Sequence, residues 1–343
     1  MTTVGPGSAG VAHFAPTATG GAMAWHASDG VHVTPLTADD ARAGADLVVP
    51  GSNVLGFAAG PGEFGLLVPR PPDQLVLVRI GDTGTSLADT VLIAGGDHAV
   101  QGVEWFGEFA QTGRLVRING GYAAYSAVHR RWPDGIGHQG DQLRRVMDTG
   151  TVQVDWSWGC SHSGDQRLLD APAGLAPVCL ADCYPQKAIM FDHTASVISN
   201  EPLGNCAGTY GGELGGLAAG DGGFWFDYAS REGRASNDVA LVQLGPSGQV
   251  LQRQWIAQTA VDESRPRLAS FDGALLAGWL VGGQRLVQRV GLDGLAVGAP
   301  ETLTADAPFY VESDWVAHPN GDVVWAFGSA GQLQVARFRA CVP

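Results

Sequence analysis

The stretch FDGALLAGWLVGGQRLVQRVGLDG, residues 271–294, contains a pattern that recurs along the whole chain. A glycine turn at its start is followed by the apolar strand candidate ALLAGWL, a short connection, a further strand candidate QRLVQRV and a second turn, GLDG. Asp-Gly and Gly-Gly pairs suit such turns because glycine accepts the positive φ that tight hairpins need. The stretch therefore predicts part of a small antiparallel sheet.

The same unit occurs seven times. Its turn glycines lie at positions 20, 60, 120, 174, 222, 273 and 321, with spacings of 40, 60, 54, 48, 51 and 48 residues. A repeat of about 50 residues with three or four strands is typical of a β-propeller blade. We therefore predict an all-β protein, a seven-bladed β-propeller in a single domain. A pair of β-sandwiches is the alternative, but it does not account for seven evenly spaced units.

The repeat also predicts where the blades lie. We expect them at approximately residues 10–50, 51–95, 105–158, 159–203, 204–260, 261–308 and 309–343. The last unit ends at its third strand, so the residues before Gly10 are expected to supply its outer strand and close the circle. Closure would remove exposed sheet edges, which otherwise invite aggregation.

The charge of the chain argues against nucleic-acid binding. The formal net charge is −14, only 16% of residues are charged, and no run of basic residues occurs. Phosphate binding needs clustered lysine and arginine. An acidic surface keeps a protein soluble and can also attract cations. The expected partner is a small molecule, a peptide or a carbohydrate, and the protein is expected to be a monomer.

Sequence features also bear on the compartment. No stretch approaches the run of about 20 apolar residues that a membrane span requires. The N-terminus, MTTVGPGSAGVAHF, lacks the basic region and apolar core of a signal peptide. Four of the five cysteines lie within 47 residues, which suits disulfides in an oxidising compartment. We expect a secreted or periplasmic protein whose signal peptide is absent from this sequence; a cytosolic location is the alternative.

One window, HRRWPDGIGHQGDQLRRVMDTGTVQVDWSWGCSHS at residues 129–163, holds three of the nine histidines. In a propeller blade the second-to-third strand connections share one face with the connections between blades. The predicted long loop from Arg130 to Asp141 and the connection that carries His162 should therefore lie on the same face. Loops that meet on a rigid scaffold often carry function. His193 falls at a turn of the opposite face and is expected to be a solvated turn residue.

Histidine near carboxylates supports either metal ligation or general acid–base catalysis near neutral pH. We expect His138 and His162 to ligate a divalent or copper-type transition metal, zinc or copper, with His129 as a third candidate. Asp141 or Asp165 would orient a ligand or act as the base. The spacing matches no compact zinc motif such as HExxH, so hydrogen-bonded structural histidines are the alternative.

Two arginines are candidates for holding an anionic substrate. Arg265 and Arg267 flank Pro266 at the start of a predicted strand, and a guanidinium binds a carboxylate through two parallel hydrogen bonds. The alternative is an ion pair with Asp262 or Glu263. Both arrangements stay open.

Two further side chains are candidates for contacting the substrate. Trp132 lies on the predicted long loop, where its ring could stack on a sugar or an aromatic group. Glu213 lies at the start of the fifth blade and is expected close to the propeller axis. The tryptophans of the blade strands are expected to pack between blades instead.

The clustered cysteines allow three interpretations. Cys160, Cys179, Cys183 and Cys206 are expected to form two disulfides that join the third to fifth blades. Alternatively, Cys160 and His162 point to the same side of a strand and form part of a thiolate–imidazole site for zinc or copper. A catalytic cysteine is the third interpretation.

Part of the chain resembles a known family. The runs HRRWPDGIGHQGDQLRRV, WSWGCSHSGDQRLL and CLADCYP, within residues 119–190, resemble a family of exported bacterial seven-bladed propeller proteins with no assigned reaction. That resemblance implies the propeller fold and export. The pair Cys160 and His162 is also similar to zinc-containing propeller polysaccharide lyases, in which histidine and tyrosine perform a β-elimination near a metal site. This similarity implies an enzyme with a metal site.

Two functional hypotheses follow from the sequence. The first is an exported metal-dependent enzyme with a histidine-centred site that acts on an anionic or carbohydrate-like substrate; a lyase and an oxidoreductase are both open. The second is a noncatalytic propeller that binds a glycan or a protein across the same face, with a structural metal or disulfides. A metal content measurement distinguishes the two hypotheses.

Overall fold

The computed structural model describes residues 1–7, 10–107, 111–160, 162–181, 188–193, 196–200, 212–304 and 306–340. Within these residues the chain forms strands and turns, and no segment is helical. The same residues include no helix with the length and apolar character of a membrane span. The alternating and apolar segments of the sequence therefore became strands, as their β-branched and aromatic content favours.

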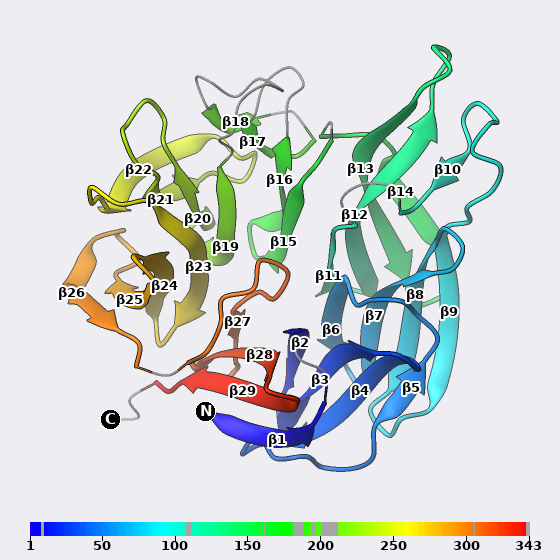
Figure 1. Cartoon of the computed structure of the whole chain (residues 1–343), viewed down its shortest axis with the longest axis horizontal. Coiled ribbons are helices and arrows are strands. Elements are labelled where there is room, and N and C mark those ends of the chain that lie inside the picture. The colour runs from blue at the N-terminus through cyan, green and yellow to red at the C-terminus, as the bar shows by residue number, and fades with distance from the viewer. Residues whose placement is uncertain are drawn as a thin grey trace. The chain divides into compact units, whose positions relative to one another are not determined.

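The chain folds into two compact units (Figure 1). Unit 1 comprises Met1–Ser163 and Trp325–Ala336, and unit 2 comprises Gly164–Val324 and Arg337–Pro343. Each unit is described by itself below. The single-domain organisation expected from the sequence stays a prediction.

Unit 1 contains three sets of antiparallel strands that follow one another along the chain, and the first set belongs to an eight-stranded sheet that also includes strands near both chain ends. The first has β2 (Gly10–Thr17), β3 (Gly20–Ala27), β4 (Gly30–Thr37) and β5 (Leu47–Val49). The second has β6 (Gly56–Gly60), β7 (Glu63–Arg70), β8 (Gln74–Gly81) and β9 (Ser86–Ile93). The third has β10 (Glu104–Trp105), β11 (Gly113–Ile118), β12 (Gly121–Arg131), β13 (Gly137–Met147) and β14 (Val152–Trp156).

Unit 2 contains three four-stranded antiparallel sheets. They are β15 (Asp165–Ala171), β16 (Gly174–Ala181), β17 (Ala188–Phe191) and β18 (Ser196–Asn200); then β19 (Glu213–Gly220), β20 (Gly223–Ser230), β21 (Asp238–Leu244) and β22 (Val250–Ala257); then β23 (Glu263–Phe271), β24 (Ala274–Val281), β25 (Gln284–Val290) and β26 (Ala296–Thr302).

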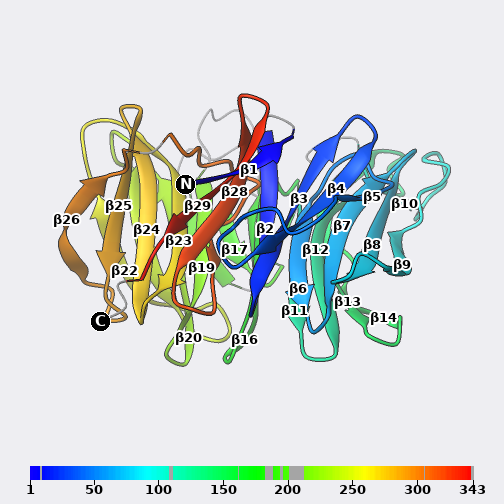
Figure 2. The same cartoon turned by 90° about the horizontal axis from the view of Figure 1, so that it is seen from below.

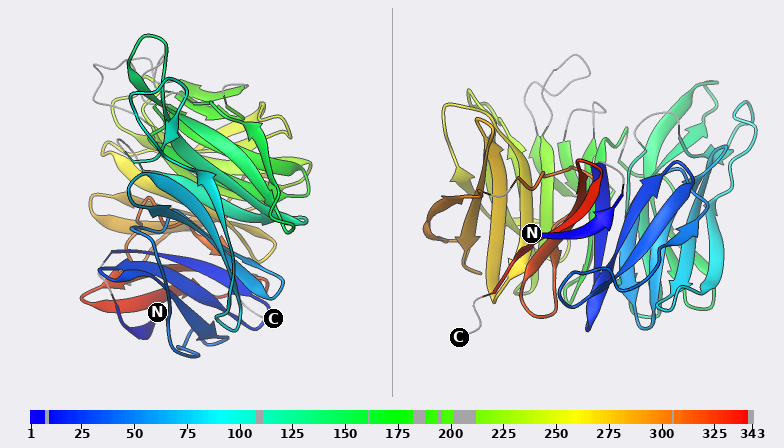
Figure 3. Two further views of the ribbon diagram at one scale, coloured as in Figure 1. Left: turned by 90° about the vertical axis from the view of Figure 1, so that its right-hand side faces the viewer. Right: turned by 60° about the horizontal axis from the view of Figure 1, so that its bottom comes forward.

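A seventh set of strands uses both ends of the chain. It comprises β27 (Val316–Ala317), β28 (Val323–Ser329), β29 (Gln332–Phe338) and β1 (Thr2–Pro6). The N-terminal strand β1 pairs antiparallel with β29, so the blue and red strands lie side by side in Figure 3. Strand β28 also pairs with β2 through Gly10 and Val11 (Figure 2). The residues before Gly10 thus take the place that the sequence predicted for an outer strand.

Apolar clusters fill the space between neighbouring sheets of each unit. In unit 1 one cluster joins the sheets of β2–β5 and β6–β9, and another joins β6–β9 to β11–β13. In unit 2 one cluster joins β16–β18 to β19–β21, and another joins β19–β22 to β23–β25. Strand β20, FWFDYA with its flanking residues, is buried along its entire length. A sheet that is covered on both faces needs such continuous apolar strands, because both of its faces pack against neighbouring sheets.

Candidate functional site

The hairpin of β12 and β13 in unit 1 carries four of the side chains that the sequence singled out, His129, Trp132, His138 and Asp141. The ladder continues to the pair Arg131–Gly137, so only residues 132–136 connect the strands. The backbone N–H of Trp132 donates to the carbonyl of Ile136 at 3.1 Å, and Gly135 has a φ of 79° that a tight turn requires. The long loop predicted up to Asp141 is therefore wrong: strand pairing extends through most of it.

The pairing register of β12 and β13 places the two histidines of this hairpin on opposite faces of the sheet. His129 pairs with Gln139 across the ladder, and His138 pairs with Arg130. Because successive strand residues point to opposite faces, His129 and His138 lie on opposite faces of the sheet. His129 is fully buried, and its ring stacks on Trp105 with 5.8 Å between centroids. The structure does not bring His129 into a common ligand set with His138.

His138 instead forms a hydrogen-bonded pair with Asp134. Its Nε2 lies 2.9 Å from Oδ2 of Asp134, while Oδ1 accepts the backbone N–H of Ile136 at 2.8 Å. These two hydrogen bonds, the backbone one being the larger cause, hold the pKa of Asp134 below its ordinary value of 3.8. The ring of His162 lies 6.3 Å from that of His138, at 74°. His162 has a φ of 46°, and its N–H donates to the carbonyl of Gln139 at 2.9 Å.

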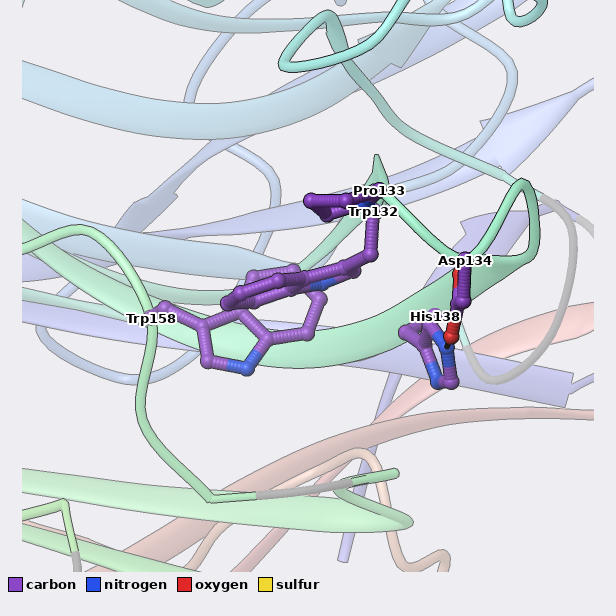
Figure 4. A pocket seen from close by; sticks show the side chains of 5 residues that line it. All are labelled: Trp132, Pro133, Asp134, His138 and Trp158. Atoms are coloured by element: carbon purple, nitrogen blue, oxygen red, sulfur yellow. Dashed lines mark hydrogen bonds and ion pairs between the residues drawn. The ribbon is translucent and has the colours of Figure 1, made fainter.

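These side chains border an open pocket of about 350 Å³ (Figure 4). Trp132, Pro133 and Trp158 lie on one side, and Asp134 and His138 lie on the other. The indoles of Trp132 and Trp158 meet edge to face, with centroids 5.4 Å apart and planes at 76°. This volume falls within the range of small-ligand pockets, about 300–1,000 Å³.

A glycine allows the pocket wall to form. A Cβ at Gly140 would lie 2.7 Å from Cε2 of Trp158, so only glycine lets this indole lie flat on β13. The guanidinium of Arg130 also lies over the Trp158 ring, 5.5 Å from its centroid, and donates to Glu104. The Trp158 ring therefore packs between the backbone at Gly140 and the guanidinium of Arg130, and these two contacts fix the position of the pocket wall.

The described residues do not supply three converging ligands for a metal at this pocket. None of the predicted histidines belongs to a group of three donor atoms within 4.8 Å of one another. A zinc or copper site needs three or four such donors. The metal site at His138 and His162 stays a prediction, and the arrangement does not fit it.

Asp141 lies inside unit 1 rather than in the pocket. It is fully buried, and its Oδ2 accepts a hydrogen bond from the hydroxyl of Tyr125 at 2.5 Å. Burial raises its pKa to about 7, although hydrogen bonds from Tyr125, Trp156 and the backbone of Cys160 oppose the shift. Its backbone carbonyl accepts the N–H of Gly159 at 2.8 Å. Asp141 therefore fastens the segment that carries Trp158 to β13.

Unit 2 contains a separate cluster of buried charges. The guanidinium of Arg167 donates to Oδ2 of Asp165 at 2.7 Å and to the backbone carbonyls of Leu214, Gly215 and Val311. Oδ1 of Asp314 lies 3.4 Å from Nε of Arg167. The predicted catalytic residue Asp165 is therefore the ion-pair partner of an arginine that ties β15 to β19 and to the segment before β27.

Arg267 has a similar role. Its guanidinium is buried and donates to the carbonyls of Pro266 and Tyr310. Burial, and then the neighbouring Arg167, lower its pKa to about 10. Arg267 was predicted to bind an anionic substrate. This geometry does not favour that role, because its guanidinium donates to backbone carbonyls.

The backbone beside this arginine is shaped by Glu213. Its Oε2 accepts the backbone N–H of Arg265 at 2.6 Å. Arg265 has a φ of 53°, and the ladder of β23 is interrupted between Ser264 and Arg267. Glu213 thus holds a bulge in the neighbouring sheet. Asp262, the ion-pair partner considered for the arginines, lies 3.3 Å from Arg231 instead.

Sequence reasoning missed three residues that line the pocket, Pro133, Asp134 and Trp158. Trp158 is among the tryptophans expected to pack between blades, and neither Pro133 nor Asp134 was singled out. The available signals were the turn Pro133-Asp134-Gly135, typical of a tight connection, and the small residue Gly140 opposite an aromatic segment. His193 lies in the turn between β17 and β18, where the sequence placed it.

Cys160 and Cys179 are both disulfide-bonded, which confirms the disulfide interpretation for these two residues. Neither is then available as a thiolate ligand or nucleophile. Cys183, Cys206 and Cys341 lie outside the described residues.

The disulfide-bonded state predicts a thiol count. Denatured, non-reduced protein should react with a thiol reagent at no more than three of its five cysteines, and at all five after reduction. Alkylation followed by mass spectrometry measures this count and identifies the labelled peptides. Labelling of Cys160 or Cys179 before reduction would contradict the structure.

No protein-family model matches the chain. No curated protein matches it either. Among solved structures, the WD40 β-propeller domain of Doa1 is similar, with a TM-score of 0.55 and 13% identity over 99% of this chain and 96% of that chain. A structure from a study of two prolyl endopeptidases has a TM-score of 0.49 and 12% identity, covering 96% of this chain and 50% of that chain. The Doa1 likeness shows the fold alone, and the predicted seven-bladed β-propeller is confirmed.

Proposed function

We propose that this protein is a recognition propeller that binds its ligand in the pocket of Trp132, Asp134, His138 and Trp158 and catalyses no reaction there. The observation that carries the proposal is the pocket itself, which opposes an aromatic wall to a hydrogen-bonding wall. Pockets of this composition fix a ligand through apolar contact and orient it through a few polar groups.

The positions of the predicted catalytic residues favour ligand binding over catalysis. Asp141 and Arg267 are buried, and Asp165 is the ion-pair partner of Arg167. A general base must reach the proton that it removes, within hydrogen-bonding distance or through one water. The disulfide-bonded cysteines are consistent with an oxidising compartment, so we further propose that the protein acts outside the cytosol.

Replacing Trp132 by alanine should weaken ligand binding about 30-fold, or by about 2 kcal/mol, as expected for an aromatic residue central to a binding site. Trp132 is 38% exposed, so the substitution should leave folding intact. Titration of tryptophan fluorescence with a panel of amines, capped amino acids, short peptides and sugars identifies the ligand and its affinity.

Ile136→Ala is the matched control. Ile136 lies in the same connection and is exposed, but its side chain does not border the pocket. Its affinity should stay within about twofold of the wild type, since surface substitutions away from a site have small effects. Equal affinity of Trp132→Ala and the wild type for the ligand would move the binding site elsewhere and refute the proposal.

A further inference from the structure

The polar wall of the pocket presents hydrogen-bond acceptors. Both oxygens of Asp134 accept, one from the N–H of Ile136 and the other from Nε2 of His138. An ionised carboxylate has no proton to give, so Nε2 of His138 must carry the hydrogen. In the neutral imidazole, Nδ1 is then a lone-pair acceptor. A ligand that satisfies this wall has to bring donors.

The same wall is negatively charged. The Asp134 side chain is half-exposed, and its hydrogen bonds hold its pKa below 3.8, so it is ionised at neutral pH. Of the two arginines nearby, Arg130 is paired with Glu104, and Arg131 donates to the backbone carbonyls of His98 and Gly135. The chain as a whole carries a formal charge of −14, which attracts cations over longer distances.

The aromatic wall suits a flat cation. A guanidinium stacks on an indole face and at the same time donates to a carboxylate in its own plane. Unit 2 already contains this combination: the guanidinium of Arg234 lies 3.1 Å from the ring centroid of Trp255 and donates to Asp238. In the pocket, Trp132 and Asp134 offer the same two partners, and among the described residues that line it there is no lysine or arginine.

We infer that the pocket selects a cationic group with N–H donors, and that the guanidinium of an arginine side chain is its best match. The inference rests on the proposed recognition function and adds the chemistry of the ligand. A neutral sugar ring would also stack on Trp132, but it would leave the charge of Asp134 without a counter-ion.

Isothermal titration calorimetry with two isosteric probes tests this charge selectivity. N-acetyl-arginine amide carries the guanidinium, and N-acetyl-citrulline amide replaces it with a neutral urea of the same shape. At about pH 8, where ordinary histidines are neutral, the wild type should bind the arginine probe at least about tenfold more tightly than the citrulline probe. Raising the salt concentration should narrow the difference, because the charges are exposed.

Asp134→Asn removes the charge while keeping an oxygen for the N–H of Ile136. In this variant the preference for arginine over citrulline should fall below about threefold, as expected when a charge-assisted hydrogen bond is lost. Asp39→Asn, an exposed carboxylate on the connection between β4 and β5, makes the same change in net charge and should keep the full preference.

Two further probes distinguish the source of the cation. If agmatine and a capped pentapeptide with a central arginine bind equally, the ligand is a small guanidine compound; if the peptide binds more tightly, the ligand is a segment of a basic protein. Equal binding of the arginine and citrulline probes, or tight binding of methyl glucoside that depends on Trp132, overturns the inference and leaves the recognition function standing. Failure of every cationic probe to bind folded wild type also overturns it, and the wider panel used with Trp132→Ala then decides the proposed function separately.

Discussion

Replacing Arg167 by leucine is expected to lower the free energy of unfolding of the protein by about 4 kcal/mol, in the range for breaking a buried ion pair. The side chain is 2% exposed, so the substitution cannot be compensated by water. It would remove the hydrogen bonds that Arg167 donates to Oδ2 of Asp165 and to the carbonyls of Leu214 and Val311. Removing such a partner from a buried polar group costs about 1–3 kcal/mol.

Equilibrium urea denaturation, followed by circular dichroism, measures this loss. Arg289→Leu is the control. The side chain of Arg289 is 41% exposed, and its ion pair with the exposed Asp272, at 3.4 Å, lies on the surface. Such surface pairs contribute about 0–1 kcal/mol. Arg167→Lys should recover only part of the stability, since an ammonium cannot make the same fork of hydrogen bonds. A loss below about 1 kcal/mol for Arg167→Leu would contradict a buried ion pair, because only solvent-exposed pairs contribute so little.

A second large effect is expected from pH, through Asp227 in unit 2. Its Oδ1 accepts the N–H of Gly216 at 2.6 Å, and it is fully buried. Burial raises its pKa from 3.8 to about 7, against the opposing effects of that hydrogen bond and of Arg267 and Arg167. The folded protein therefore binds a proton that the unfolded chain releases between these two pH values.

The sign of the pH dependence follows from this difference. The stabilisation from protonated Asp227 is fully present below pH 3.8 and is lost as the pH rises to about 7, a change of up to about 4 kcal/mol. Asp141 in unit 1 contributes in the same direction. The carboxylates whose pKa is lowered, such as Asp148 and Asp322, act below their ordinary value of 3.8 and so outside this range.

Urea denaturation at a series of pH values from 4 to 8 tests this expectation. The wild type should become less stable as the pH rises, and Asp227→Asn should have a smaller slope because an amide does not titrate; the part of the slope due to Asp141 should remain. The matched exposed change Asp39→Asn should leave the slope as it is in the wild type. Stability that rises over this range, or an unchanged slope in Asp227→Asn, would show that this carboxyl is ionised in the folded protein.

The fold was predictable because it depends on local chemistry that repeats. The turn glycines at 120, 222 and 273 all have positive φ, and strands begin directly after them at β12, β20 and β24. Repetition also made the closing strand predictable, because a unit with a missing outer strand implies that one is supplied elsewhere in the chain.

The candidate site was predictable only in part. The window of residues 129–163 does contain the pocket, but the register decides which of its side chains meet. A shift of one residue in the pairing of β12 and β13 would bring His138 to the face of the sheet that carries His129. Sequence spacing alone could not determine the register, because the length of the connection depends on how far the two strands stay paired.

The arginines show the same limit. Arg265 and Arg267 look alike in sequence, on either side of Pro266, yet one adopts a positive φ with its N–H on Glu213 and the other is buried against Tyr310. Their partners come from segments about 50 and 40 residues away in the chain. No local pattern encodes such pairings.

By itself, the sequence determined the strands, the turns, the number of blades and the general region of the site, because hairpin glycines and apolar alternation act over a few neighbouring residues. Only the tertiary structure decided that Trp158 packs on Gly140, that Asp134 rather than Asp141 faces the pocket, and that Arg167 and Arg267 donate to backbone carbonyls. The physical reason is that burial, charge and hydrogen bonding at a site depend on which segments meet in space, and that meeting is set by strand register and packing.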